Sequence, residues 1–180
     1  MSRFVLLALL FTITAVAGLA QSEQPAKKGP QKGAVLLETE YNLIGGILGG
    51  GSGLTLLSSG GGTAVGLGID GGFFVGNRTA VLGKLGLLTA DGTSITSIGS
   101  GIKHYFAGVI PVGAELGLIF ASDASSGGGA TTFTWAVNGG YAARLADNIY
   151  FEPFVGVLGF EGGGSFQGGA RFAMLLGRGR

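Results

Sequence analysis

Residues 63–88 read TAVGLGIDGGFFVGNRTAVLGKLGLL. Apolar side chains recur at alternate positions of this stretch, glycine or a single charge lies between them, and Val75–Arg78 supplies turn-forming residues. Strict alternation is the pattern of a β-strand with two unlike faces, and a turn between two such runs indicates an antiparallel hairpin. The stretch therefore predicts two strands, Thr63–Phe74 and Thr79–Leu88.

The same alternating pattern continues on both sides of this hairpin. Six further runs of alternating apolar and small or polar residues are separated by Gly, Ser, Asn and Asp. These runs are Ala34–Leu43, Ser94–Phe106, Pro111–Phe120, Ala130–Ala143, Asn148–Leu158 and Ser165–Leu176. Eight short strands at regular spacing are typical of an all-β sandwich or barrel.

Two kinds of connection separate the predicted strands. Val75–Arg78, Ala107–Ile110 and Leu145–Asn148 are tight turns. The connections on the other side are mostly longer and richer in Ser and Gly: Gly45–Gly62, Ala90–Gly92, Ala121–Gly129 and Gly159–Gly164. Short turns on one side and longer loops on the other are typical of bacterial outer-membrane barrels, whose tilted strands need roughly 10 residues to cross the bilayer. We therefore expect an all-β protein, an eight-stranded antiparallel up-and-down transmembrane β-barrel.

The composition excludes several other classes of protein. The 39 glycines among 180 residues do not recur at every third position, which excludes a collagen triple helix. The absence of cysteine excludes a disulfide framework, and a net charge of +1 is too balanced for a nucleic-acid binder. Only 12% of residues are charged, whereas the water-facing side of a soluble sandwich would need far more Lys and Glu.

The sparse charges fall on the polar faces of the predicted strands, which would line the barrel lumen. The predicted lumen residues are five acids and four bases: Glu38, Glu40, Asp70, Lys84, Lys103, Glu115, Arg144, Glu152 and Arg171. A buried charge is costly unless it is paired, so we expect a neutralising network across the barrel. Eight strands enclose an interior just wide enough for side chains, which argues against an open diffusion pore.

Aromatic residues gather beside the three tight turns. Membrane barrels carry aromatic girdles at the two membrane interfaces. The predicted girdle beside the turns consists of Phe73, Phe74, Tyr105, Phe106, Tyr141, Tyr150 and Phe151.

The N-terminus has the three parts of a secretory signal peptide. Arg3 precedes an apolar run, Phe4–Ala20, and small residues occupy Gly18 and Ala20 before the expected cut. The rival interpretation is a membrane anchor, but seventeen residues lie at the short end of the spanning range. We expect a signal peptide at 1–20, a flexible periplasmic tail at 21–33, the barrel at 34–177 and a short basic tail at 178–180.

The strand-turn-strand phrases at Gly66–Val81 and Gly139–Glu152, with the strand end Lys103–Phe106, resemble those of a known family. They are similar to the small eight-stranded outer-membrane β-barrel proteins, particularly the porin-like barrels of Bacteroidota-type bacteria. This resemblance implies a Gram-negative outer-membrane location. The chain departs from the family pattern at its end, where Phe172 is the last aromatic residue.

Motifs for catalysis or cofactors are weak. Gly66–Gly71 matches G-x-G-x-x-G but lies within an alternating strand, so it lacks the strand-turn-helix context of a dinucleotide site. His104 is the only histidine, and no spacing singles out Ser97 or Ser100 as its partner. The uncharged stretch Tyr41–Ile69 could be read as a transmembrane helix, but its many glycines disfavour one. We therefore predict no catalytic, cofactor-binding or metal-binding residues.

The expected function is that of a non-enzymatic outer-membrane protein, in membrane integrity, surface contact or limited passage of small solutes. Its expected partners are outer-membrane lipid and, during biogenesis, the assembly machinery and periplasmic chaperones. We expect a monomer and no nucleic acid. Two alternatives stay open: a barrel enzyme that modifies lipid, with His104 as its base, and a soluble secreted β-barrel that binds an apolar ligand.

Overall fold

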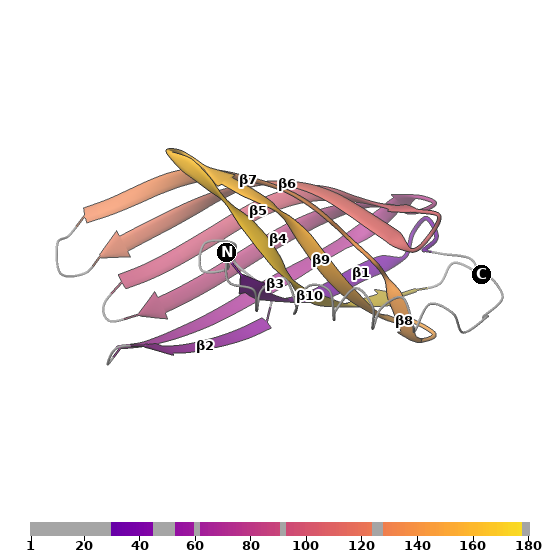
Figure 1. The fold of residues 1–180 in the computed structure, drawn as a ribbon, viewed down its shortest axis with the longest axis horizontal. Helices are drawn as coiled ribbons and strands as arrows, with labels where there is room; N and C mark the ends of the chain where they lie inside the picture. The colour runs from indigo at the N-terminus through magenta and orange to yellow at the C-terminus, as the bar shows by residue number, and fades with distance from the viewer. Residues whose placement is uncertain (1–29, 45–52, 60–61, 91–92, 124–127, 178–180) are drawn as a thin grey trace, which may run out of the picture.

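The computed structural model describes residues 30–44, 53–59, 62–90, 93–123 and 128–177 (Figure 1). The predicted signal peptide, most of the predicted periplasmic tail and the basic tail at 178–180 lie outside the described residues. Within the part of the chain that is described, no helix is long and apolar enough to cross a membrane.

Eight strands form a closed antiparallel barrel. In chain order they are β1 (Val35–Ile44), β3 (Gly62–Gly76), β4 (Thr79–Ala90), β5 (Thr93–Phe106), β6 (Ile110–Asp123), β7 (Gly128–Gly140), β9 (Ile149–Phe160) and β10 (Gly163–Leu176). Each strand pairs with the next in this order, and β1 pairs with both β10 and β3. The ring closes where Val35–Glu38 of β1 pairs with Asp70–Phe73 of β3. The predicted fold class, an eight-stranded antiparallel β-barrel, is confirmed.

Two short strands complete the sheet. β2 (Gly53–Ser59) pairs with Gly62–Gly68 of β3, along the same edge that β1 occupies further down. β8 (Ala143–Ala146) pairs with the start of β9 in the register that β7 has, because Gly140 faces Phe154 and Ala143 faces Phe151, so β8 continues β7 after a two-residue gap. The predicted connection Gly45–Gly62 therefore contains a strand, and the predicted run Ala130–Ala143 is interrupted after Gly140.

The three predicted tight turns lie together at one end of the barrel, which we call the terminal end because β1 starts and β10 finishes there (Figure 1). Backbone hydrogen bonds tie this end together: Gly33 N–H donates to the Phe74 carbonyl, and Leu175 N–H donates to the Asn148 carbonyl, each at 2.8 Å. Arg78 and Ala107 adopt positive φ angles of 77° and 50°, which compact turns require of the residue at their bend.

The connections at the opposite end, the far end, are shorter than predicted. Seven of the barrel strands are 12–15 residues long. Only Glu161 and Gly162 connect β9 to β10, and Gly162 has a φ angle of 91°. The prediction of a longer loop at Gly159–Gly164 is therefore wrong. Ladder hydrogen bonds join backbone groups, so the ladders continue into the Ser- and Gly-rich flanks where the apolar alternation fades.

Alternation along the strands separates an apolar outer face from a more polar lumen. Every barrel strand presents large apolar side chains outward. Examples, one from each strand, are Leu37, Leu67, Leu85, Ile98, Leu116, Trp135, Val155 and Phe172. At the described outward positions of these strands there is no Asp, Glu, Lys or Arg. The charged side chains of the barrel are therefore gathered inside it.

Candidate functional site

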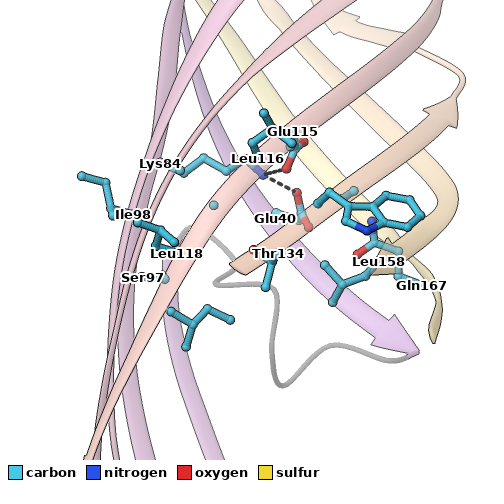
Figure 2. Close-up of a pocket in the computed structure, with 15 residues that line it drawn as sticks. Glu40, Lys84, Ser97, Ile98, Glu115, Leu116, Leu118, Thr134, Leu158 and Gln167 are labelled. Carbon is cyan, nitrogen blue, oxygen red and sulfur yellow. Dashed lines mark ion pairs between the residues drawn. The ribbon is translucent and has the colours of Figure 1, made fainter. Parts of the chain in front are cut away.

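The middle of the lumen holds a cluster of charged side chains around Lys84, which we call the central cluster. Lys84 Nζ lies 2.7 Å from a Glu115 carboxylate oxygen, 3.3 Å from one of Asp70 and 3.7 Å from one of Glu40, and Figure 2 marks the pairs with Glu115 and Glu40. Arg171 completes the cluster, because its Nε donates to Glu40 at 2.6 Å. Three carboxylates and two cations thus meet from five different strands.

Arg171 makes several contacts beyond its pair with Glu40. Its guanidinium also donates to the Asn138 Oδ1 at 3.0 Å and lies 4.0 Å from the centre of the Phe154 ring. Asn138 in turn donates its amide to Glu115 at 3.2 Å. The planar guanidinium suits this place because it can hydrogen-bond in its plane and stack on an aromatic face at once.

A second group, the lysine cluster, lies nearer the terminal end. Lys103 Nζ forms ion pairs with Glu38 and, at 3.0 Å, with Glu152. The Tyr105 hydroxyl donates to the other Glu152 oxygen at 2.8 Å. Lys103 is 1% exposed and Glu152 is fully buried, so each charge is compensated by a partner of the opposite sign rather than by water.

Register brings these groups together. Glu40 faces Arg171 across β1 and β10, Arg171 faces Glu152 across β10 and β9, and Asp70 faces Lys84 across β3 and β4. Directly opposed residues of opposite charge stabilise a strand pair, and all of these positions point inward. Only the ion pairs Lys84–Asp70 and Arg171–Glu40 join neighbouring strands, and the other ion pairs of Lys84, Lys103 and Arg171 cross the lumen to strands that are not adjacent in the sheet.

The structure brings eight of the nine predicted lumen residues into these two clusters, and the exception is Arg144. Arg144 lies in β8 at the terminal end, on the same face as its opposed neighbour Tyr150, where it pairs with exposed Asp147 in the following turn and donates to the Ala146 carbonyl. The prediction that Arg144 joins the charge network is wrong because it lies beside the turn, within reach of Asp147.

The network in the described lumen joins five acids to three bases, so it holds one base fewer than the predicted set of five acids and four bases. The central cluster has one carboxylate more than it has cations, and so does the lysine cluster. Asp70 is the least satisfied of these acids. It is buried, and neither of its carboxylate oxygens accepts a hydrogen bond from a described residue. Lys84 is close enough to compensate its charge, but it is directed toward Glu115.

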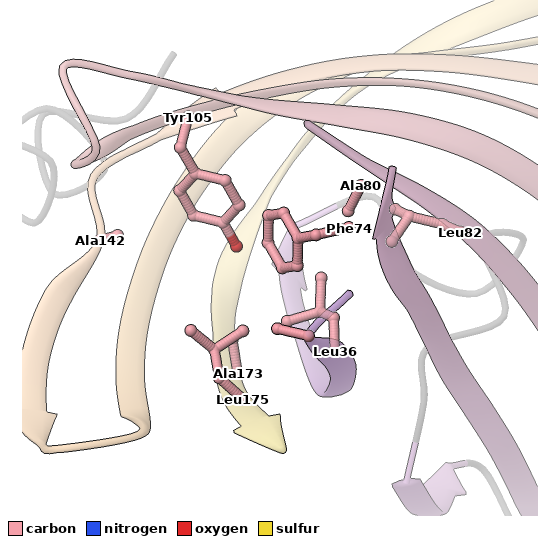
Figure 3. Packing of buried hydrophobic residues seen from close by; sticks show 9 residues of the cluster. Leu36, Phe74, Ala80, Leu82, Tyr105, Ala142, Ala173 and Leu175 are labelled. Atoms are coloured by element: carbon pink, nitrogen blue, oxygen red, sulfur yellow. The ribbon is translucent and has the colours of Figure 1, made fainter. Parts of the chain in front are cut away.

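Apolar side chains close the lumen at the terminal end. Figure 3 shows Leu36, Phe74, Leu82, Tyr105 and Leu175 converging there. The rings of Phe74 and Tyr105 lie 5.9 Å apart, and small alanines fill the remaining space. This apolar cluster and the lysine cluster, which lies beside it toward the middle of the barrel, fill the terminal half of the lumen.

Two of these side chains were predicted in the aromatic girdle, and that prediction is wrong for both. Phe74 and Tyr105 are 1% and 2% exposed and point inward. Consecutive residues of a strand point to opposite faces, so only one member of each adjacent aromatic pair can face outward. The outward members are Phe73 and Phe106, which are both exposed.

The remaining predicted girdle residues lie at the terminal end with intermediate exposure. Phe151 packs on Phe172, with ring centres 5.3 Å apart. Tyr150 packs against the apolar cluster inside the barrel. Tyr141 lies after β7, where its N–H donates to the Pro153 carbonyl. The aromatic residues near the turns are therefore divided between the lumen and the outer face.

The far half of the lumen contains a pocket that the sequence did not predict. Its volume is about 550 Å³, including space open to solvent. The central cluster forms its floor through Glu40, Lys84 and Glu115 (Figure 2). Its walls carry Ser97, Thr134, Gln167, Ile119, Ala136 and Leu158, and two inward glycines, Gly99 and Gly117. These glycines, with Gln167 at an inward position, were the signal in the sequence that could have revealed it.

His104 lies on the outer side of the barrel near the terminal end. Its Nδ1 is 2.9 Å from the Thr79 hydroxyl, its directly opposed neighbour across β4 and β5, and its ring packs edge-on against Phe106. The hydroxyls considered from the sequence, Ser97 and Ser100, are not its partners. In the described part of the chain no group of His, Asp and Glu could hold a metal ion.

No family model matches the chain, and no curated protein matches its sequence. Among solved structures, the chain is similar to one described as "De novo design of transmembrane beta-barrels". The two are 10% identical, the match covers 83% of this chain and 99% of the other, and the TM-score is 0.41.

Proposed function

We propose that this protein is an integral, non-enzymatic β-barrel of a Gram-negative outer membrane. One observation carries the proposal: the barrel is apolar outside and charged inside. Soluble proteins place charged side chains outside and rarely expose large contiguous apolar patches. Here Leu67, Ile69, Leu85 and Leu116 are each more than half exposed, and each lies on a different strand except the first two. Lipid is the solvent that suits such a surface.

The backbone also suits a bilayer. Unpaired N–H and C=O groups are costly in hydrocarbon, so only helices and closed barrels span membranes. Eight strands close this ring, and seven of them exceed the roughly 9–11 residues that a tilted strand needs to cross. The predicted signal peptide supports export. On this proposal both ends of the barrel chain lie in the periplasm, and the connections at the far end lie on the outer side of the membrane.

The lumen favours a role in membrane integrity or surface contact over open diffusion. The apolar cluster and the lysine cluster occupy the terminal half of the lumen, and their members are almost fully buried. Passage of small solutes would therefore be limited. The partners on this proposal are outer-membrane lipid, and the assembly machinery and periplasmic chaperones during biogenesis, and the mature protein is a monomer.

The test is extraction and gel mobility of the full chain expressed in a Gram-negative host. We expect the protein in the outer-membrane fraction, resistant to alkaline and urea washes, with a faster-running band when unboiled that shifts to the full mass on boiling. In planar bilayers we expect no steady open-pore conductance. Recovery from the aqueous periplasmic fraction without detergent would refute the membrane proposal and favour a soluble barrel that binds an apolar ligand.

A lipid-modifying enzyme is the second candidate, because His104 contacts a hydroxyl, that of Thr79, at 2.9 Å. A histidine base beside a hydroxyl is the start of a nucleophilic site, which also needs an orienting group and an oxyanion donor. The test replaces His104 with Ala and Thr79 with Val and compares membrane lipid composition. If expression of the wild-type protein changes the acyl chains or headgroups of the membrane lipids and both variants abolish that change, this role is established. If expression of the wild-type protein changes neither, this role is excluded.

A further inference from the structure

A pair of polar side chains lies on the outer face of the barrel near the terminal end. Thr79 starts β4 and is directly opposed to His104 of β5. Both point outward, because Lys103, the neighbour of His104, is buried in the lumen. Two residues further toward the middle of the barrel, Val81 and Ile102 are exposed and apolar. The Thr79–His104 pair therefore lies at the edge of the apolar outer surface.

This pair has a hydrogen-bond donor left for a ligand in both tautomers of the imidazole. The Thr79 hydroxyl oxygen and the His104 Nδ1 are 2.9 Å apart. If Nδ1 accepts the hydroxyl proton, the proton of the ring is on Nε2, which can donate it to a ligand. If Nδ1–H donates to Thr79, the hydroxyl proton is the one left over. A ligand that this pair recognises is therefore a hydrogen-bond acceptor.

Two exposed cations lie at the turn that leads into this pair. Arg78 immediately precedes Thr79, and its carbonyl accepts the N–H of Tyr105 in β5 at 2.8 Å. The Arg78 N–H donates to the Pro30 carbonyl at 3.2 Å, which brings the segment that contains Lys32 to the same turn. Arg78 and Lys32 are both exposed, and neither forms an ion pair within the described ranges. Their charges are therefore open to a partner from outside the chain.

The charges outside the lumen differ in sign between the two ends of the barrel. At the terminal end Arg144 pairs with Asp147, so the two exposed cations leave this end positive. At the far end β6 finishes at Asp123 and Glu161 follows β9, and the described ranges place no Lys or Arg there. The sequence adds four further cations just before and just after the barrel strands: Lys27, Lys28, Arg178 and Arg180. The terminal end therefore attracts anions.

We propose that Arg78, Thr79 and His104 bind the phosphate group of an anionic phospholipid in the leaflet at the terminal end. The Arg78 guanidinium pairs with the phosphate oxygens, because its planar donors match phosphate geometry. The Thr79–His104 pair donates to one of these oxygens. The acyl chains lie along the apolar surface that begins at Val81 and Ile102. This inference rests on the proposed membrane location and adds the lipid class and the leaflet.

The test counts the lipids bound to the purified full chain, folded in nonionic detergent micelles, by native mass spectrometry. The probes have the same acyl chains: phosphatidylglycerol, which is anionic, and phosphatidylcholine, whose own ammonium group neutralises its phosphate. We expect saturable binding of one phosphatidylglycerol, about fivefold or more tighter than phosphatidylcholine, because one cation at a membrane surface contributes about this factor. Added salt should reduce this preference, because it screens charges at an exposed site.

Three variants locate the site. Arg78→Gln should weaken phosphatidylglycerol about fivefold and leave phosphatidylcholine unchanged. Arg144→Gln is the matched control, because it removes the same charge from the same end at a residue that is already paired, and it should keep the preference. Thr79→Val combined with His104→Phe removes the donor, keeps a ring against Phe106 and should weaken phosphatidylglycerol about fivefold. Heat-modifiable gel mobility establishes folding, and the salt dependence of the wild type tests the site without any variant.

Three results would overturn the proposal. The first is equal affinity of the folded wild type for the two lipids. The second is equal weakening by Arg78→Gln and Arg144→Gln, which would mean that the net charge of this end attracts the lipid. The third is displacement of phosphatidylglycerol by an equal concentration of inorganic phosphate, which would mean that the site takes free phosphate. Each of these leaves the membrane proposal intact, whereas recovery of the chain without detergent refutes both.

Discussion

The lysine cluster makes a quantitative prediction about the stability of the barrel. Lys103 is 1% exposed and is the shared partner of two carboxylates, Glu38 and Glu152, which are themselves 5% and 0% exposed. Lys103→Met keeps most of the side-chain volume and removes the charge. Two buried carboxylates then lose their shared ion-pair partner, although Tyr105 still donates a hydrogen bond to Glu152.

The expected cost follows from this geometry. Breaking a buried ion pair by removing one partner destabilises a protein by about 3–5 kcal/mol, because a buried charge is left uncompensated. Lys103 compensates two such charges, so we expect a loss at or above the lower end of that range. A loss of about 3 kcal/mol lowers the ratio of folded to unfolded protein more than a hundredfold.

The assay is urea unfolding of the purified barrel in lipid vesicles, followed by Trp135 fluorescence and by loss of the fast-running gel band. The control is the triple variant Lys103→Met, Glu38→Gln and Glu152→Gln, which removes all three charges. It should regain most of the lost stability, because replacing a whole buried ion pair with neutral groups is often close to neutral. A single variant as stable as wild type, or a triple variant less stable than the single one, would refute this reasoning.

Three further predictions follow from other contacts. Leu85→Arg places a charge on the outer face near the middle of β4 and should destabilise the barrel in vesicles by about 2–4 kcal/mol, as measured by the same unfolding assay. A cost near zero would argue against lipid at this face. Tyr105→Phe removes a hydrogen bond to a buried carboxylate and should cost about 1.5–3 kcal/mol in that assay, with an unchanged midpoint contradicting the contact to Glu152. Arg144→Ala removes a pair with the exposed Asp147 and should change stability by less than about 1 kcal/mol, so a larger loss would show that Arg144 has a structural role.

The faces of the strands could be predicted from the sequence because the pleat is local. Alternation placed Glu38, Asp70 and Arg171 on the inward side before any pairing was known, and the structure has them there. The same rule was applied too loosely at the aromatic pairs. Phe73 and Phe74 were both assigned to the girdle, although neighbours on a strand must point to opposite faces.

Other features depended on contacts that alternation does not reveal. Arg144 keeps the side that alternation gives it, but it lies beside the turn and pairs with Asp147, so it does not join the charge network. The far-end ladders run into Gly- and Ser-rich segments because backbone hydrogen bonding does not require apolar side chains. For the same reason Gly53–Ser59 pairs with β3 within the predicted connection Gly45–Gly62.

The amino-acid sequence by itself determined the eight barrel strands, though not their far ends, and the inward side of charged residues such as Glu38, Asp70 and Arg171, because these follow from a period of two residues along one strand. The tertiary structure alone decided which acid meets which base, where the lumen is filled and where it is open. Those outcomes depend on the closure of β1 onto β3 and on the register between distant strands, which set the distances across the barrel. Lys84 meets Glu40 and Glu115, and a pocket lies above them, only because the ring is closed in this register.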